Sequence, residues 1–176
     1  RRALYSISLD GNRTKKLVLA NDRVDVDDLM RIGRQRRVVG ASYATEQREA
    51  QYFDTELKAL VGKLASALPG NPAIGITGAS ESENRLLLIA SSDKDPGTLY
   101  LYYKSTKQLS PLMPLRPGLA GRETSTMEPI SFPAGDGTLI PGYISLPQGS
   151  DGKNLPTIVL PHGGPSARDE WGFDWL

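Results

Sequence analysis

The residues best suited to chemistry are His162, Gly163, Gly164 and Pro165, which follow the apolar run 155–160 after Pro161. Glycine has no side chain, so the backbone there can approach a substrate closely and aim its N–H groups at it. Backbone donors of this kind stabilise the oxyanion of acyl transfer, and one such donor is worth about 10²–10³ in rate. We therefore predict an oxyanion loop at this position, with an ordinary glycine turn as the alternative.

The elements ahead of this loop are expected to position it. The run 155–160 has the composition of a buried parallel strand. Residues 129–132 and 139–146 flank an Asp-Gly turn and predict a β-hairpin. In α/β-hydrolases an oxyanion donor comes from the loop after the third strand, where HGGG-type motifs occur. A strand followed by a glycine loop is therefore the expected setting.

Residues 155–165, with the Trp-Gly-Phe-Asp sequence at 171–174, resemble the prolyl oligopeptidase family of serine peptidases, in particular its acylaminoacyl-peptidase and dipeptidyl-peptidase-like branch. The preceding residues 136–147 resemble the first hydrolase hairpin of that family. The resemblance is specific over 129–174 and weaker in the preceding part of the chain. It implies a β-propeller joined to an α/β-hydrolase domain, and hydrolysis of short peptides through an acyl-enzyme.

The resemblance also implies a role for each residue of the loop. By motif position, Gly164 offers its backbone N–H to the oxyanion, Gly163 shapes the turn and His162 orders the loop. In the family a serine in a G-x-S-x-G elbow follows this loop, and the acid and the histidine base come after it. No such elbow follows Gly164 in these 176 residues. We expect the chain to be a fragment of a serine peptidase, inactive by itself.

Two serines imitate parts of the elbow. Ser42 lies in Gly-Ala-Ser-Tyr-Ala, and Ser80 ends Gly-Ala-Ser. Both precede the glycine loop, whereas the nucleophile is expected after it. We therefore expect ordinary strand or turn serines. His162 is the single histidine of the chain and belongs to the loop, so we do not expect it to act as the general base.

Composition excludes several classes of protein. The chain has 39% hydrophobic residues, a net charge of +1, one histidine and no cysteine. It can form neither disulfides nor a two-histidine zinc site, and we expect no metal and no cofactor. The balanced charge predicts no nucleic-acid or membrane partner, and no apolar run reaches the ~20 residues of a membrane span. Oligomeric state is left open, as is a cytoplasmic, periplasmic or secreted location.

Short strands with polar turns predict a mainly β fold. The expected strands are residues 3–9, 16–19, 38–43, 50–53, 73–77, 86–90 and 98–103. The run 86–90 lacks alternation, so we expect it to be covered on both faces. Residues 55–68 have helical periodicity, with Asp54 as the N-cap and Pro69 as the stop. An unclosed sheet would expose its edges, and a β-propeller is one solution to that problem.

These patterns divide the chain into three parts. We expect residues 1–117 to be the C-terminal blades of a propeller, with a helical insertion near 55–68. Prolines and glycines then predict a linker at 118–128. Residues 129–176 are expected to be the N-terminal strands and the oxyanion loop of a truncated α/β-hydrolase domain.

Three further groups of residues have less specific signals. The first is a basic cluster, expected to be a solvated loop, formed by Arg31, Arg34, Arg36 and Arg37. The second is an acidic group without calcium-loop spacing, expected to be surface acids, formed by Asp25, Asp27 and Asp28. The third is a pair of tryptophans, Trp171 and Trp175, which could line a cleft or pack beneath the loop.

Two other functions remain open at this stage. One is an esterase or lipase of the HGGG-bearing α/β-hydrolase group, which Pro165 and the long β-rich region ahead of the loop disfavour. The other is a non-catalytic β-rich interaction module. The leading interpretation is a serine peptidase whose partners are short peptide substrates.

Overall fold

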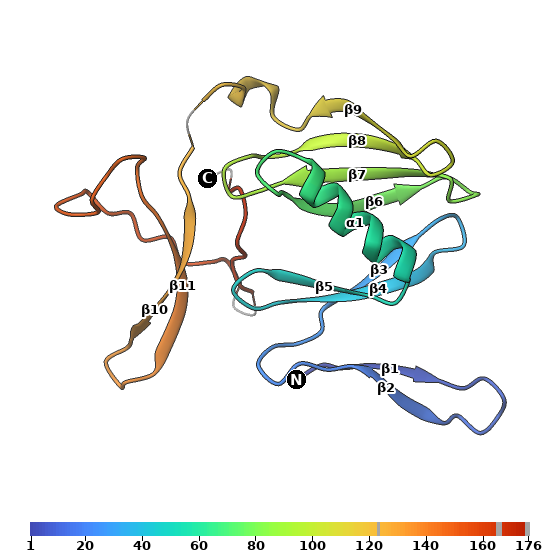
Figure 1. Cartoon of the computed structure of the whole chain (residues 1–176). Coiled ribbons are helices and arrows are strands. Elements are labelled where there is room, and N and C mark those ends of the chain that lie inside the picture. The colour runs from blue at the N-terminus through green and yellow to red at the C-terminus, as the bar shows by residue number, and fades with distance from the viewer. Residues whose placement is uncertain (123, 165–166, 175–176) are drawn as a thin grey trace.

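The computed structural model describes residues 1–122, 124–164 and 167–174. Within these residues the chain has eleven strands, one α-helix and one short 3-10 turn at Pro117–Leu119. Every strand pair is antiparallel, and the strands form four separate open sheets (Figure 1). The predicted mainly β class is confirmed. No helix in the described part of the chain is long and apolar enough to cross a bilayer.

The first two sheets contain the strand pairs that we predicted from residues 3–19 and 38–53. β1 (Leu4–Ile7) pairs with β2 (Lys15–Leu19). A three-stranded sheet has the order β3 (Asp28–Ile32), β4 (Arg37–Ala44) and β5 (Arg48–Tyr52). β3 was not predicted, because the charged residues at both ends of its Leu-Met pair conceal the strand pattern.

The next sheet has four strands in sequential order. These are β6 (Ala73–Ala79), β7 (Arg85–Ser91), β8 (Thr98–Tyr103) and β9 (Gln108–Pro114). A four-stranded antiparallel meander is the unit from which propeller blades are built. β9 contains prolines and lies at the sheet edge, where a missing N–H costs no ladder bond. The open sheets are consistent with partial propeller blades.

The predicted helix is present as α1 (Thr55–Ala67). It lies beside the three-stranded sheet β3–β5 and the four-stranded sheet β6–β9 (Figure 1). The Asp54 side chain accepts a 3.1 Å hydrogen bond from the Leu57 N–H, which confirms the expected N-cap. The helix ends at Ala67, with Leu68 as its C-cap just before Pro69. Leu57 and Leu64 are buried in one core with residues of both sheets, namely Ile32, Val39, Leu86, Leu88 and Tyr102.

The expectation that residues 86–90 are covered on both faces is wrong. Leu86, Leu88 and Ala90 are buried, whereas Leu87 and Ile89 between them are only half-buried. The reason is that β7 lies in an antiparallel sheet with α1 packed on one face. Its other face has only partial cover.

The predicted hairpin near 129–146 is confirmed. β10 (Met127–Pro133) pairs along its whole length with β11 (Leu139–Ser145). The Ala134 N–H donates to the Thr138 carbonyl at 2.8 Å, and Gly137 adopts a φ of +83° in the turn. Since β10 begins at Met127, the predicted linker 118–128 extends two residues too far.

The prediction of a buried strand at 155–160 is contradicted. These residues form no strand, and Ile158 and Val159 are 90% and 84% exposed. A parallel strand needs neighbouring strands on which to pair, and in the described part of the chain none lies beside this run. The whole chain exposes 12735 Å², against about 8,400 Å² for a compact monomer of its mass. Much apolar surface of the hairpin and of this run is therefore uncovered.

Candidate functional site

The glycine loop, residues 162–164, is an exposed stretch without regular structure. His162 Nδ1 lies 2.7 Å from the carbonyl oxygen of Gly163, which is a hydrogen bond when Nδ1 carries the proton. Space around the Cα of Gly163 is open, with no atom within 4 Å of a built Cβ. The loop can therefore be approached from solvent. Pro165 lies outside the described residues.

The segment after the loop is fastened to the three-stranded sheet β3–β5 by Arg168. Its two terminal nitrogens donate to the carbonyls of Ala44 and Thr45 at 2.7 and 2.6 Å. The next carbonyl, that of Glu46, accepts a 2.7 Å hydrogen bond from the Tyr143 hydroxyl of β11. Three consecutive carbonyls at the turn between β4 and β5 thus bind side chains from the later part of the chain, which passes between this turn and the hairpin (Figure 1).

A second fastening joins Glu170 to Arg48 of β5. Arg48 Nε donates to Glu170 Oε2 at 2.7 Å, and a second nitrogen of the same guanidinium binds the other carboxylate oxygen. Asp27 accepts two bonds from Arg48, of 2.8 and 3.0 Å. These bonds from Arg48 hold the pKa of Asp27 below its ordinary value. The two carboxylates, first that of Glu170, raise the pKa of Arg48. The guanidinium is thus held on two edges.

Trp171 attaches the same segment to the hairpin. Its indole N–H donates to the Met127 carbonyl at 2.7 Å, and the side chain is half-buried. Of the two roles considered for this residue, packing support fits this position better than lining a cleft. Trp175 lies outside the described residues.

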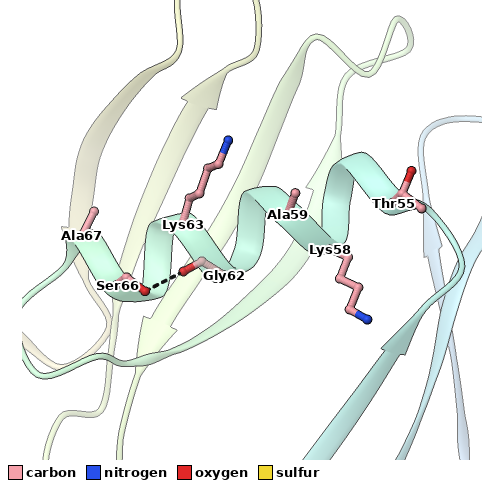
Figure 2. A pocket seen from close by; sticks show the side chains of 7 residues that line it. All are labelled: Thr55, Lys58, Ala59, Gly62, Lys63, Ser66 and Ala67. Carbon is pink, nitrogen blue, oxygen red and sulfur yellow. Dashed lines mark hydrogen bonds between the residues drawn. The ribbon is translucent and has the colours of Figure 1, made fainter.

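Two hollows on the described surface are not lined by the glycine loop. The larger one runs along the outer face of α1, and Figure 2 shows that all seven lining residues come from this helix: Thr55, Lys58, Ala59, Gly62, Lys63, Ser66 and Ala67. Ser66 donates to the Gly62 carbonyl at 3.0 Å. No carboxylate lines this hollow. A smaller space, about 180 Å³, lies between the Lys94 loop and residues 144–150.

The two elbow-like serines are ordinary structural residues, as predicted. Ser42 lies within β4, is 4% exposed, and accepts a 2.9 Å hydrogen bond from Arg48. Ser80 follows β6, and its hydroxyl accepts a hydrogen bond from the Arg85 N–H at 3.1 Å. In the part of the chain that the structure describes, neither serine hydroxyl is hydrogen-bonded to a histidine, the base that would activate it as a nucleophile.

The expected solvated loop accounts for only part of the basic cluster. Arg34 and Arg36 lie exposed in the turn between β3 and β4, whereas Arg31 and Arg37 lie in the strands themselves. Arg37 donates to both Asp54 and Glu83, and Arg34 forms an ion pair with Glu81 at 3.3 Å. Arg34 and Arg37 therefore join the three-stranded sheet to the turn between β6 and β7. Sequence spacing could not reveal these partners, which are 46 and 47 residues away along the chain.

The acidic group is divided among different partners. Asp25 pairs with Arg2, Asp27 binds Arg48, and Asp28 begins β3. Among the described residues, no group of three or more His, Asp or Glu side chains is placed to hold a metal ion. Asp27 was expected to be a surface acid. Its bond to Arg48, 21 residues away along the chain, could not be predicted from the spacing of the acidic residues.

No family model matches this chain. Individual relatives do. Dipeptidyl aminopeptidase BIII of Pseudoxanthomonas mexicana is 27% identical over 186 aligned positions, which cover 99% of this chain and 26% of that protein. Dipeptidyl peptidase family member 6 of Caenorhabditis elegans is 31% identical over 129 positions, which cover 59% of this chain and 17% of that protein.

The chain is similar in sequence to dipeptidyl peptidases. It spans about a quarter of the length of the bacterial relative and about a sixth of that of the nematode relative. Because the bacterial alignment extends over nearly the whole chain, the similarity includes the β-rich region as well as the glycine loop. The names of these relatives agree with the peptidase character that the resemblance implied.

Sequence reasoning missed Arg48, Arg168 and Glu170. Arg168 and Glu170 stand in a charged stretch after the glycine loop, which offered a weak local signal. Arg48 offered none, because its partner Glu170 lies 122 residues away along the chain. Only the path of the backbone brings these side chains together.

Proposed function

We propose that this chain is part of a serine-type peptidase that removes dipeptides from the N-terminus of short peptides through an acyl-enzyme. The observation that carries this proposal is the alignment of 99% of the chain with a dipeptidyl aminopeptidase. The glycine loop at 162–164 supplies the chemical reason, because acyl transfer needs a preorganised donor for the oxyanion.

In this proposal the Gly164 N–H is the oxyanion donor. Gly163 shapes the turn, and the His162 ring orders the loop through its contact with the Gly163 carbonyl. The donor stabilises the tetrahedral intermediates of both acylation and deacylation. The serine, the acid and the histidine base are supplied from outside these 176 residues, so the chain alone is inactive.

The domain assignment forms part of the same proposal. Residues 1–117 form propeller blades, the linker runs from residue 118 to the start of β10 at Met127, and the chain from β10 onward begins the hydrolase domain. Two structural features support it: the sequential four-stranded sheet β6–β9, and the separate hairpin of β10 and β11. The propeller would limit access to short or unfolded peptides, the partners expected of this enzyme.

The test is carried out on the complete protein that contains this sequence and on the 176-residue chain. A fluorophosphonate probe should label the complete protein and leave the chain unlabelled. The complete protein should release 4-nitroaniline from a dipeptidyl 4-nitroanilide faster than from an acetyl-aminoacyl one. Preference for a short acyl ester with no peptide turnover would favour an esterase instead. Stoichiometric labelling of the isolated chain would show that its proposed inactivity is wrong.

A further inference from the structure

The segment that follows the glycine loop is fastened to other parts of the described structure. Arg168 binds the turn between β4 and β5, Glu170 binds Arg48 of β5, and Trp171 binds the Met127 carbonyl of β10. This segment therefore ties the glycine loop to the three-stranded sheet β3–β5 and to the hairpin of β10 and β11.

Covalent reach makes this fastening relevant to the donor. Gly164 and Arg168 are four residues apart, so their Cα atoms stay within about 14 Å even when the chain between them is fully extended. Arg168 is itself held by the carbonyls of Ala44 and Thr45. Release of Arg168 would remove the fastening that lies nearest in sequence to the glycine loop and joins it to the three-stranded sheet β3–β5.

The bonds of Arg168 and the Arg48–Glu170 ion pair are better suited to orienting the segment than to stabilising the fold. A guanidinium presents its donors in a rigid plane, so two adjacent carbonyls define both its position and its direction. The Arg48 and Glu170 side chains are each 36% exposed. Ion pairs with this much exposure contribute little to folding free energy, but a pair with two parallel hydrogen bonds still fixes geometry.

We propose that Arg168 and Glu170 are positioning residues that hold the glycine loop in register with the turn between β4 and β5. This inference rests on the proposed function, since it gives the loop the role of oxyanion donor. Through these residues, the turn between β4 and β5 sets the position of the Gly164 N–H. A displacement of about 1 Å at such a donor is enough to cost about 10²-fold in rate.

The experiment compares variants of the complete protein. Arg168→Met removes both carbonyl bonds, Arg168→Lys keeps the charge but loses the planar fork, and Glu170→Gln removes the carboxylate charge at nearly constant shape. Arg37→Gln is the matched control, because Arg37, like Arg168, is an arginine that joins two parts of the chain through two acceptors, here the carboxylates of Asp54 and Glu83. Each variant is assayed for kcat and KM on a dipeptidyl 4-nitroanilide.

A positioning role predicts that kcat falls while KM stays nearly unchanged. Arg168→Met should lower kcat about 10- to 100-fold with KM within about twofold of wild type, because transition-state stabilisation is lost while ground-state binding is kept. Arg168→Lys should recover less than half of that loss on a logarithmic scale, and Glu170→Gln should lower kcat about threefold to tenfold. Arg37→Gln should leave both constants within about twofold. Wild-type kcat in folded Arg168→Met and Glu170→Gln would overturn the inference.

Hydrogen exchange separates this inference from the proposed function. In Arg168→Met and Glu170→Gln, the Thr45 amide, which donates to the Gln47 carbonyl at 3.0 Å in the turn that Arg168 binds, should exchange at least about threefold faster than in wild type, with Arg37→Gln unchanged. If wild-type protein neither hydrolyses the substrate nor reacts with the probe, the proposed function is wrong, and with it the catalytic purpose of the fastening. If the protein is active and exchange of the Thr45 amide stays the same in both variants, the fastening itself is refuted. Glu170→Gln decides the matter should Arg168→Met fail to fold.

Discussion

Arg48 and Glu170 form a two-point ion pair across 122 residues of sequence, with Arg48 Nε donating to Glu170 Oε2 at 2.7 Å. Arg48 belongs to β5 of the three-stranded sheet, whereas Glu170 follows the glycine loop. The pair therefore joins the two regions that the proposed function assigns to different domains. Asp27 completes the arrangement by binding the other edge of the same guanidinium.

Replacement of Gly164 by proline should remove the proposed oxyanion donor. Proline has no N–H, so kcat/KM of the complete protein on a dipeptidyl 4-nitroanilide should fall by about 10²–10³. Gly164→Ala keeps the N–H and serves as the control, with a smaller loss expected. If Gly164→Pro retains wild-type kcat/KM, this residue does not supply the donor.

Truncation of Leu57 should destabilise the fold strongly. Its side chain is 0% exposed and packs in the core that α1 shares with both neighbouring sheets. Leu57→Ala should lower the free energy of unfolding by about 2–5 kcal/mol, because it removes buried methyl groups and leaves a cavity. Urea denaturation of the 176-residue chain measures the change, and Lys58→Ala on the exposed face of α1 is the control. Equal losses in the two variants would contradict the assignment of the core.

An alanine at position 40 should strain the three-stranded sheet. A Cβ at Gly40 would lie 2.7 Å from the Gln51 carbonyl oxygen and 3.2 Å from Tyr52 Cα, both backbone atoms of β5. We expect Gly40→Ala to lower the free energy of unfolding by about 1–3 kcal/mol. Gly75→Ala in β6 is the matched control, because nothing lies within 4 Å of its built Cβ. A shift in the urea midpoint no larger than that of the control would show that β5 can move aside.

The bonds of Arg37 predict a dependence of stability on acid pH. Hydrogen bonds from Arg37 hold the pKa of Glu83 below its ordinary 4.5, and the Leu57 N–H, then Arg37, lowers the pKa of Asp54 from 3.8. Because both values are depressed on folding, the unfolded chain binds more protons at acid pH. The stabilisation is fully present well above pH 4.5 and is lost as pH falls through the lower, folded-state values.

Glu83→Gln tests this dependence. It should reduce the difference between urea midpoints measured at pH 7 and at pH 3, since one of the two depressed carboxyls is gone. Glu81→Gln in the same turn breaks only an exposed pair with Arg34, so it should change the difference little. An unchanged pH difference in Glu83→Gln would assign the acid sensitivity to other carboxylates.

Asp54 should stabilise α1 as its N-cap. Asp54→Ala removes the acceptor of the Leu57 N–H and one partner of Arg37, and should lower the free energy of unfolding by about 1–2 kcal/mol. Asp54→Asn keeps the capping oxygen while losing the charge, and should recover most of that loss. Thermal and urea unfolding followed by circular dichroism measure both variants. Equal stability of Asp54→Ala and wild type would contradict the capping role.

Local patterns in the sequence determined the elements whose bonds join near neighbours. The helix near 55–67, its Asp54 cap and the hairpin turn at Gly137 are of this kind, because periodicity and turn geometry involve residues a few positions apart. The glycine loop at 162–164 was also found from its residue types alone. The proposed function therefore depends on two features of the sequence: the glycine loop and the similarity to dipeptidyl peptidases.

Tertiary structure alone decided the contacts between distant segments. The exposure of residues 155–160 could not be predicted, because burial of an apolar run depends on whether neighbouring strands lie beside it. Only one face of β7 is buried for the same reason: α1 covers one side of its sheet. The pairing of Arg48 with Glu170 depends on the backbone path over 122 residues, and no periodicity or local propensity carries that information.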